Sequence, residues 1–238
     1  MASKKLIIVD RRKVLKLNKR QKKYLEYTLI LIILFLSFFF WNSFVVYPIK
    51  LFVVLTHEMS HGIAAIITGG KLHSILITNS LGGESRTIGG NNFVIASAGY
   101  LGSLLFGAAL YISGNTEKFR KVFSIFLSIL LILFAANYLE GYLGKIASVL
   151  FASLFIIAPI YFPQIANSIL YKLLGLISMF YVAIDIKEDI LTNVYRPSDA
   201  QFIATLTSVS ATVWGILWLI ISLTTISFLL RWSYKKDF

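Results

Sequence analysis

The chain has 238 residues, of which 57% are hydrophobic and only 14% are charged. A soluble domain of this size carries about a quarter charged residues, so the composition excludes an ordinary soluble globular protein. The apolar residues fall in long blocks, which indicates a polytopic membrane protein. These blocks should be helices, because lipid offers no partner to an unpaired backbone group.

Much of the net charge of +12 lies at the N-terminus, where residues 1–24 hold ten lysines and arginines against Asp10 alone. This segment directly precedes an apolar block, so we expect a cytoplasmic tail that contacts anionic lipid headgroups, and no nucleic acid. No small-residue cleavage site follows, which favours a retained first transmembrane helix over a signal peptide. We therefore predict a tail over 1–24, one membrane-embedded domain over 25–232 and a C-terminal tail over 233–238.

Seven apolar blocks are each long enough, at about 20 residues, to cross a bilayer. The expected fold is all-α, with about six or seven transmembrane helices. Counting seven crossings from a cytoplasmic N-terminus places the basic C-terminal stretch RWSYKK outside, against the positive-inside rule. One span, most plausibly within 114–165, is therefore expected to be broken or re-entrant. The blocks occupy residues 25–46, 48–68, 92–113, 121–139, 144–162, 167–190 and 206–230.

Residues 71–90, KLHSILITNSLGGESRTIGG, are too polar to span a membrane. Two short β-like runs flank an Asn-Ser-Leu-Gly-Gly turn, a pattern typical of a β-hairpin. We expect this hairpin at the membrane surface or against protein, where its backbone groups can pair. A plain surface loop is the alternative.

The second block contains a His-Glu-x-x-His motif formed by His57, Glu58 and His61. The two histidines are four residues apart, so on a helix they share one face and both imidazoles can reach one Zn²⁺ ion. Glu58 lies beside them and could take a proton from water. A pair of interfacial histidines with a neighbouring carboxylate is the alternative, although such groups are costly to bury in mid-span without a function.

A catalytic zinc ion needs a third protein ligand, and the chain has no cysteine to supply it. Asp185 is the favoured candidate, because a carboxylate deep in an apolar run is costly unless it is compensated. Asp189, one turn later on the same face, is a less favoured ligand or a partner that orients one. Both could instead be helix-end carboxylates that pair with Lys187 or Arg196. The remaining candidates are His73, Glu140, Glu188 and Asp199, and Asp199 or Ser198 could simply cap the last helix.

Small residues recur in the third block at Ala98, Gly102, Ser103 and Gly107. Such spacing lets helices approach closely in a membrane. We expect the 92–113 helix to pack tightly against the helix that carries the two histidines. Generic membrane packing would explain the same pattern.

Five segments resemble the M50 (site-2 protease) class of intramembrane metalloproteases, and more closely its M50B-like branch. They recur in order over residues 55–200 as HEMSHGIAAIITGGKL, GGESRTIGG, SAGYLGSLLFGA, YVAIDIKEDI and RPSDA. The resemblance implies zinc held by His57 and His61, Glu58 as the general base, and an aspartate on a later helix as third ligand. The chain lacks the Asn-x-x-Pro-x-Pro-x-x-Asp-Gly motif and the PDZ domain of other branches.

The leading hypothesis is an intramembrane zinc endopeptidase that cleaves a transmembrane segment of another membrane protein. The alternative is a catalytically inactive, protease-like protein that binds membrane clients. A transporter ranks third, because no inverted repeat is evident in the sequence.

Overall fold

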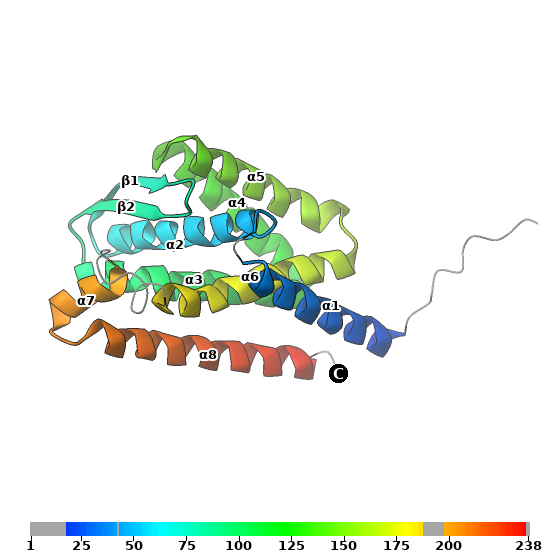
Figure 1. Ribbon diagram of the computed structural model, residues 1–238. Coiled ribbons are helices and arrows are strands. Elements are labelled where there is room, and N and C mark those ends of the chain that lie inside the picture. The colour runs from blue at the N-terminus through cyan, green and yellow to red at the C-terminus, as the bar shows by residue number, and fades with distance from the viewer. Residues whose placement is uncertain (1–17, 42, 188–197, 237–238) are drawn as a thin grey trace, which may run out of the picture.

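The structure is a computed structural model that describes residues 18–41, 43–187 and 198–236. Within these ranges eight helices and three short strands follow one another (Figure 1). They are α1 (Lys19–Phe39), α2 (Tyr47–Ile67), β1 (Lys71–Ile77), β2 (Gly83–Ile88), α3 (Asn92–Asn115), α4 (Glu117–Asn137), β3 (Leu139–Glu140), α5 (Tyr142–Tyr161), α6 (Gln164–Lys187), α7 (Asp199–Thr207) and α8 (Ala211–Lys236).

The all-α polytopic prediction is confirmed. Among the described residues, six helices are long and apolar enough to cross a membrane, namely α2, α3, α4, α5, α6 and α8. The chain is therefore an integral multi-pass membrane protein. The predicted span over 206–230 corresponds to α8, which begins later, at Ala211, because Ser208 adopts a left-handed conformation (φ 60°) that ends the preceding helix α7.

The two ends of the described chain lie on the same side of the molecule. Lys23 Nζ in α1 donates to the Tyr234 carbonyl in α8 at 3.2 Å, and the Tyr27 and Ser233 hydroxyls are 2.9 Å apart. The six candidate spans among the described residues, an even number, agree with this placement. The expectation of a broken span within 114–165 was wrong, because α4 and α5 are both continuous helices.

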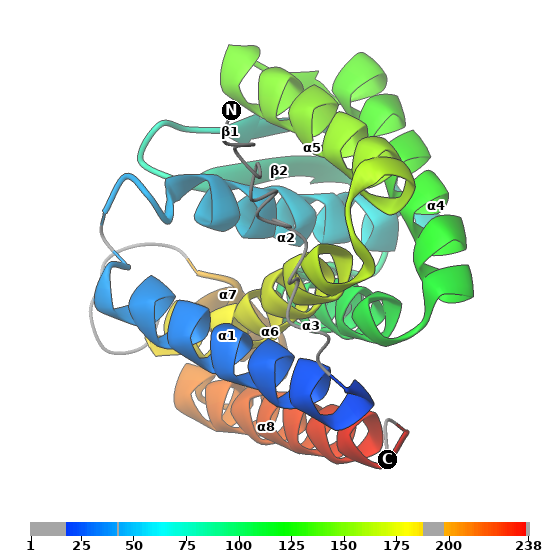
Figure 2. The same ribbon diagram turned by 90° about the vertical axis from the view of Figure 1, so that its right-hand side faces the viewer.

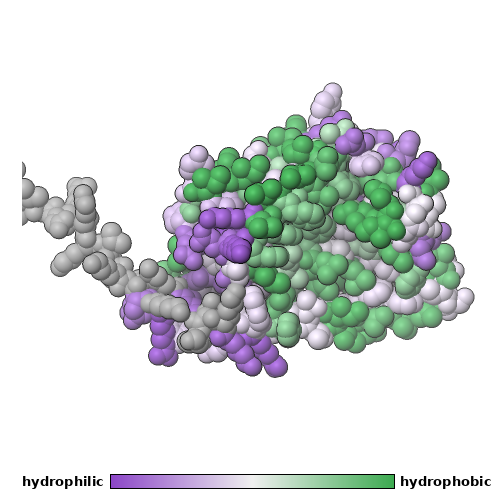
Figure 3. Space-filling view, turned by 180° about the vertical axis from the view of Figure 1, so that it is seen from behind, coloured by the Kyte–Doolittle hydropathy of each residue, from purple (hydrophilic) through white to green (hydrophobic). Residues whose placement is uncertain are grey.

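The helix that carries the His-Glu-x-x-His motif is the most enclosed of the six. Protein buries 78% of the most apolar part of α2, compared with 28% for α8 and 33% for α4 and α5. In the end-on view, α4 and α5 lie on one side of the bundle and α1 and α8 on the other, with α2, α3 and α6 between them (Figure 2). Exposed apolar residues form a broad hydrophobic surface with hydrophilic residues mostly toward its edges (Figure 3). Contact between such a surface and the hydrocarbon of a bilayer is favourable, whereas its exposure to water is not.

The predicted β-hairpin is confirmed. β1 and β2 pair antiparallel, with Lys71 opposite Ile88 and Ile77 opposite Gly83. The short strand β3 adds a parallel neighbour to β1, which sequence analysis did not foresee, so the strand order is β2-β1-β3. The described residues give β2 no partner on its outer side. The sheet lies along α2, with β2 toward the motif (Figure 1).

Small residues let α3 contact two helices at once. A Cβ atom on Gly102 would overlap the Ser60 side chain of α2, which confirms the expected close packing of these helices. Gly107 instead packs on α6, where its Cβ would lie 2.7 Å from the Gly175 carbonyl oxygen. α3 thereby holds both α2 and α6 at fixed distances around the motif.

The tail predicted over 1–24 lies mostly outside the described residues. Its cytoplasmic placement and its contact with anionic lipid remain predictions.

Candidate metal centre

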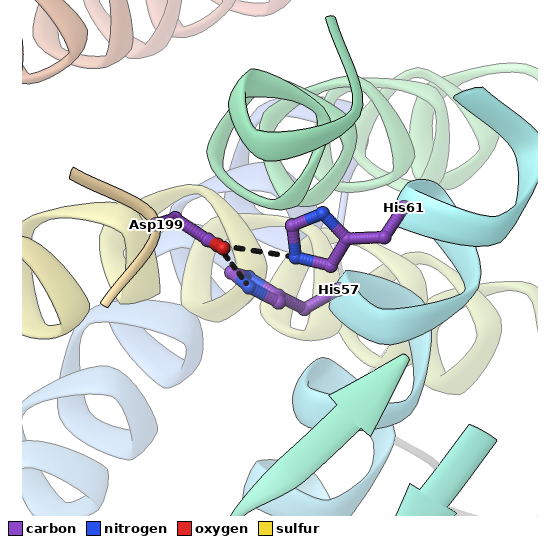
Figure 4. A group of neighbouring side chains, drawn as sticks. All are labelled: His57, His61 and Asp199. Atoms are coloured by element: carbon purple, nitrogen blue, oxygen red, sulfur yellow. Dashed lines mark hydrogen bonds and ion pairs between the residues drawn. The ribbon is translucent and has the colours of Figure 1, made fainter. Parts of the chain in front are cut away.

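His57 and His61 lie on one buried face of α2, as their spacing predicts. The Nε2 atoms of both rings are 3.1 Å from one carboxylate oxygen, Asp199 Oδ2 (Figure 4). The three side chains could hold a metal ion, because one ligand atom from each lies within 4.8 Å of the others. Two imidazoles and a carboxylate are a common ligand set for zinc.

Asp199 is the first residue of α7, and the neighbouring Ser198 acts as the helix cap. The Ser198 hydroxyl accepts a hydrogen bond from the Gln201 amide at 3.3 Å. Of the two caps that the sequence allowed, the structure therefore has Ser198, and the Asp199 side chain points to the histidines. Burial raises the pKa of the Asp199 carboxyl, but attraction to a protonated His61 and hydrogen bonds from both rings when they are protonated outweigh burial and hold that pKa far below its usual range. The carboxylate is thus ionised, as a metal ligand must be.

Asp185, the favoured third ligand of the sequence analysis, lies at a different ring atom. Its Oδ2 atom is 3.5 Å from Nδ1 of His57, the nitrogen opposite the one that faces Asp199. The geometry therefore favours Asp199 over Asp185 as the third ligand. Asp189 and Glu188 lie outside the described residues, and the three-residue group includes neither His73 of β1 nor Glu140 of β3.

Both imidazoles have an acceptor at the nitrogen that faces away from Asp199. His61 Nδ1 is 2.6 Å from the Ile95 carbonyl oxygen. His57 Nδ1 is 3.5 Å from Asp185 Oδ2 and 3.5 Å from the Ser103 hydroxyl. A histidine that donates its Nδ1–H, as His61 can to Ile95, keeps the lone pair of Nε2 for a metal. The orientation of both rings therefore fits a metal centre.

Gly99 of α3 leaves space beside these Nε2 atoms. A Cβ atom at Gly99 would lie 2.6 Å from His61 Nε2 and would overlap His57 Nε2 as well. A side chain at this position would fill the side of the rings on which their ligand atoms converge. The sequence marked the neighbouring Ala98 and Gly102 as packing residues but not Gly99.

Glu58 is held by the hairpin. Its Oε2 atom accepts a hydrogen bond of 2.6 Å from the Ser85 hydroxyl of β2, and Gly83 is so close that a Cβ there would overlap the Glu58 carboxylate. Neither contact could be derived from periodicity, although both residues fall in the GGESRTIGG segment that carried the resemblance. The hairpin thus fixes the position of the carboxylate beside the histidines.

A cavity of about 310 Å³ opens over these groups. Its wall includes the motif residues, both aspartates and much of β2, so it is polar enough to hold water. Its apolar lining includes Val54 of α2, Tyr181 of α6 and Phe202 of α7.

A family model described as Peptidase M50B-like matches residues 29–229, which include every residue of the centre. No curated protein gave a significant match to the chain, and no solved structure did so.

Proposed function

The chain belongs to the Peptidase M50B-like family, and from that premise and the geometry of the centre we propose that it is a zinc endopeptidase. It cleaves a peptide bond in or near a transmembrane segment of another membrane protein. The observation that carries this proposal is the convergence of His57, His61 and Asp199 on one point, with the Glu58 carboxylate beside them. This combination supplies both a metal site and a base.

The residues present fit zinc. His57 and His61 would bind it through Nε2 and Asp199 through Oδ2, which leaves a fourth position open as catalytic sites require. When bound, zinc polarises the substrate carbonyl and lowers the pKa of water to about 7. The space beside Gly99 and the paired Nδ1 atoms support this assignment.

Glu58 acts as the general base. Ser85 donates to Oε2, so Oε1 is left to take a proton from water and to pass it to the leaving amine. The close approach of Gly83 limits the positions that the carboxylate can adopt. β2 thereby supports the proton transfer without taking part in it.

The substrate is an extended segment that lies along β2. The outer side of β2 has no strand partner among the described residues, and Gly83, Glu84, Ser85 and Thr87 of this strand line the cavity. A peptide added to this edge would satisfy its backbone by strand pairing once it leaves its helix. Local unwinding of the substrate helix is therefore part of the proposal.

The test compares the purified wild type with Glu58→Gln in liposomes that contain a set of labelled single-span membrane peptides. We expect about one zinc per chain in both proteins, and cleavage slower by about 10²–10⁴-fold in the variant, since a general base contributes about this factor. Glutamine keeps the size of the side chain and its contact with Ser85, so the fold should be unaffected.

Equal cleavage by the two proteins, or a wild type without zinc, would refute the peptidase. A wild type that binds zinc and retains the peptides without cleaving any of them would instead support the inactive, client-binding alternative.

A further inference from the structure

The two histidines of the centre are supported in different ways. The Nδ1 atom of His61 meets a backbone carbonyl, at Ile95, which no substitution of a side chain removes. The Nδ1 atom of His57 meets only side chains among the acceptors described, those of Asp185 and Ser103. The orientation of the His57 ring is therefore sensitive to side-chain substitution in a way that the His61 ring is not.

We propose that Asp185 is a positioning residue of the zinc site: its carboxylate accepts the Nδ1–H of His57 and so directs Nε2 toward the metal. This inference rests on the zinc site of the proposed function. It assigns to Asp185 a role other than that of a ligand.

The geometry separates these two roles. A ligand must lie on the side of the rings where both Nε2 atoms converge, and the oxygen found there belongs to Asp199. Asp185 reaches His57 from the end of α6, whereas Asp199 reaches it from the start of α7. The two carboxylates thus bracket one imidazole, and only one of them faces both histidines.

Asp185 is better suited than Ser103 to hold the ring. A carboxylate can only accept from Nδ1–H when it is ionised, whereas a hydroxyl can donate as well and would then stabilise the wrong tautomer. The hydrogen bond to a carboxylate also becomes stronger as the metal draws charge from the ring. The Asp185 side chain is 19% exposed at the end of an apolar helix, where an unpaired carboxylate would be costly, and the imidazole offsets that cost.

The test measures zinc affinity in the full-length protein by competition with a chromogenic chelator, and the zinc coordination shell by X-ray absorption. We expect Asp185→Ala to bind zinc about 10–100-fold more weakly, the usual effect of losing a partner that orients a ligand. Its coordination shell should still contain two imidazoles and one carboxylate. Asp185→Asn, whose amide oxygen can accept the same hydrogen, should recover most of the affinity.

Two variants serve as references. Asp199→Ala should lose a carboxylate oxygen from the shell and bind zinc far more weakly than Asp185→Ala. Ser103→Ala, which removes only the other neighbour of Nδ1, should change the affinity little. Each protein is checked for thermal unfolding without metal, so that misfolding is recognised.

The inference is overturned if Asp185→Ala loses an oxygen from the shell, because Asp185 would then be a ligand. Unchanged affinity in Asp185→Ala overturns it too, because Asp185 would then be a bystander. A wild type that binds no zinc refutes the proposed function itself, so the two failures are distinguishable.

Discussion

Replacement of Gly99 by alanine is expected to abolish zinc binding, and with it any cleavage. The added methyl group would lie 2.6 Å from His61 Nε2 and would overlap His57 Nε2, so at least one ring must turn away. Overpacking of this kind costs about 1–3 kcal/mol, which a folded bundle can tolerate. The metal site cannot tolerate it, because zinc binding needs the Nε2 atoms of both histidines in place. Zinc content by atomic absorption, together with thermal unfolding, measures the two effects separately.

Gly144→Ala is the matched control. Gly144 is also a helical glycine, but it lies in α5 outside the cavity wall, and its Cβ would first meet a flexible Leu139 methyl group at 3.1 Å. We expect this variant to keep its zinc. If Gly99→Ala binds zinc as tightly as Gly144→Ala does, the metal does not sit between the Nε2 atoms and the centre is misassigned.

The motif could be predicted from sequence because its geometry is local. One turn of helix places His57 and His61 on the same face wherever α2 lies in the fold. The third carboxylate has no such local rule. Asp199 lies more than a hundred residues later, at the start of a short helix whose position depends on packing against α3 and α8.

The argument that singled out Asp185 was sound in part. A carboxylate at that depth does have a compensating partner, since Asp185 lies against His57. Sequence cannot tell which ring nitrogen the carboxylate meets, since that depends on the distance between α6 and α2. This distance is fixed by α3, through close contacts at Gly102 and Gly107 that no spacing rule specifies in detail.

The predicted range of about six or seven crossings is confirmed, but the first apolar block is not one of the six candidate spans among the described residues. α1 is 21 residues long, but it begins at Lys19 and ends at Phe39, so its first turns are charged and it covers only part of the predicted block 25–46. Glu26, in the first half of α1, lies against Lys172 and Ser168 of α6.

Substitution of Glu26 by alanine is expected to destabilise the protein by about 3–5 kcal/mol, because it leaves a buried ammonium group without its counter-ion. The Lys172 side chain is 2% exposed and its Nζ lies 2.5 Å from Glu26 Oε1, which also accepts from the Ser168 hydroxyl at 2.7 Å. Reversible unfolding in detergent micelles measures the change in the free energy of unfolding.

A second substitution distinguishes the buried charge from simple loss of packing. In Glu26→Ala with Lys172→Met, neither charge of this pair remains buried, so most of the stability should return even though the ion pair is gone. Glu117→Ala is the control for removal of a carboxylate from an ion pair, since its pair with Lys121 is exposed and should matter little. If the double variant is as unstable as Glu26→Ala, the buried charge of Lys172 is not the cause of the instability. The loss of the contacts that the Glu26 side chain makes would then explain it.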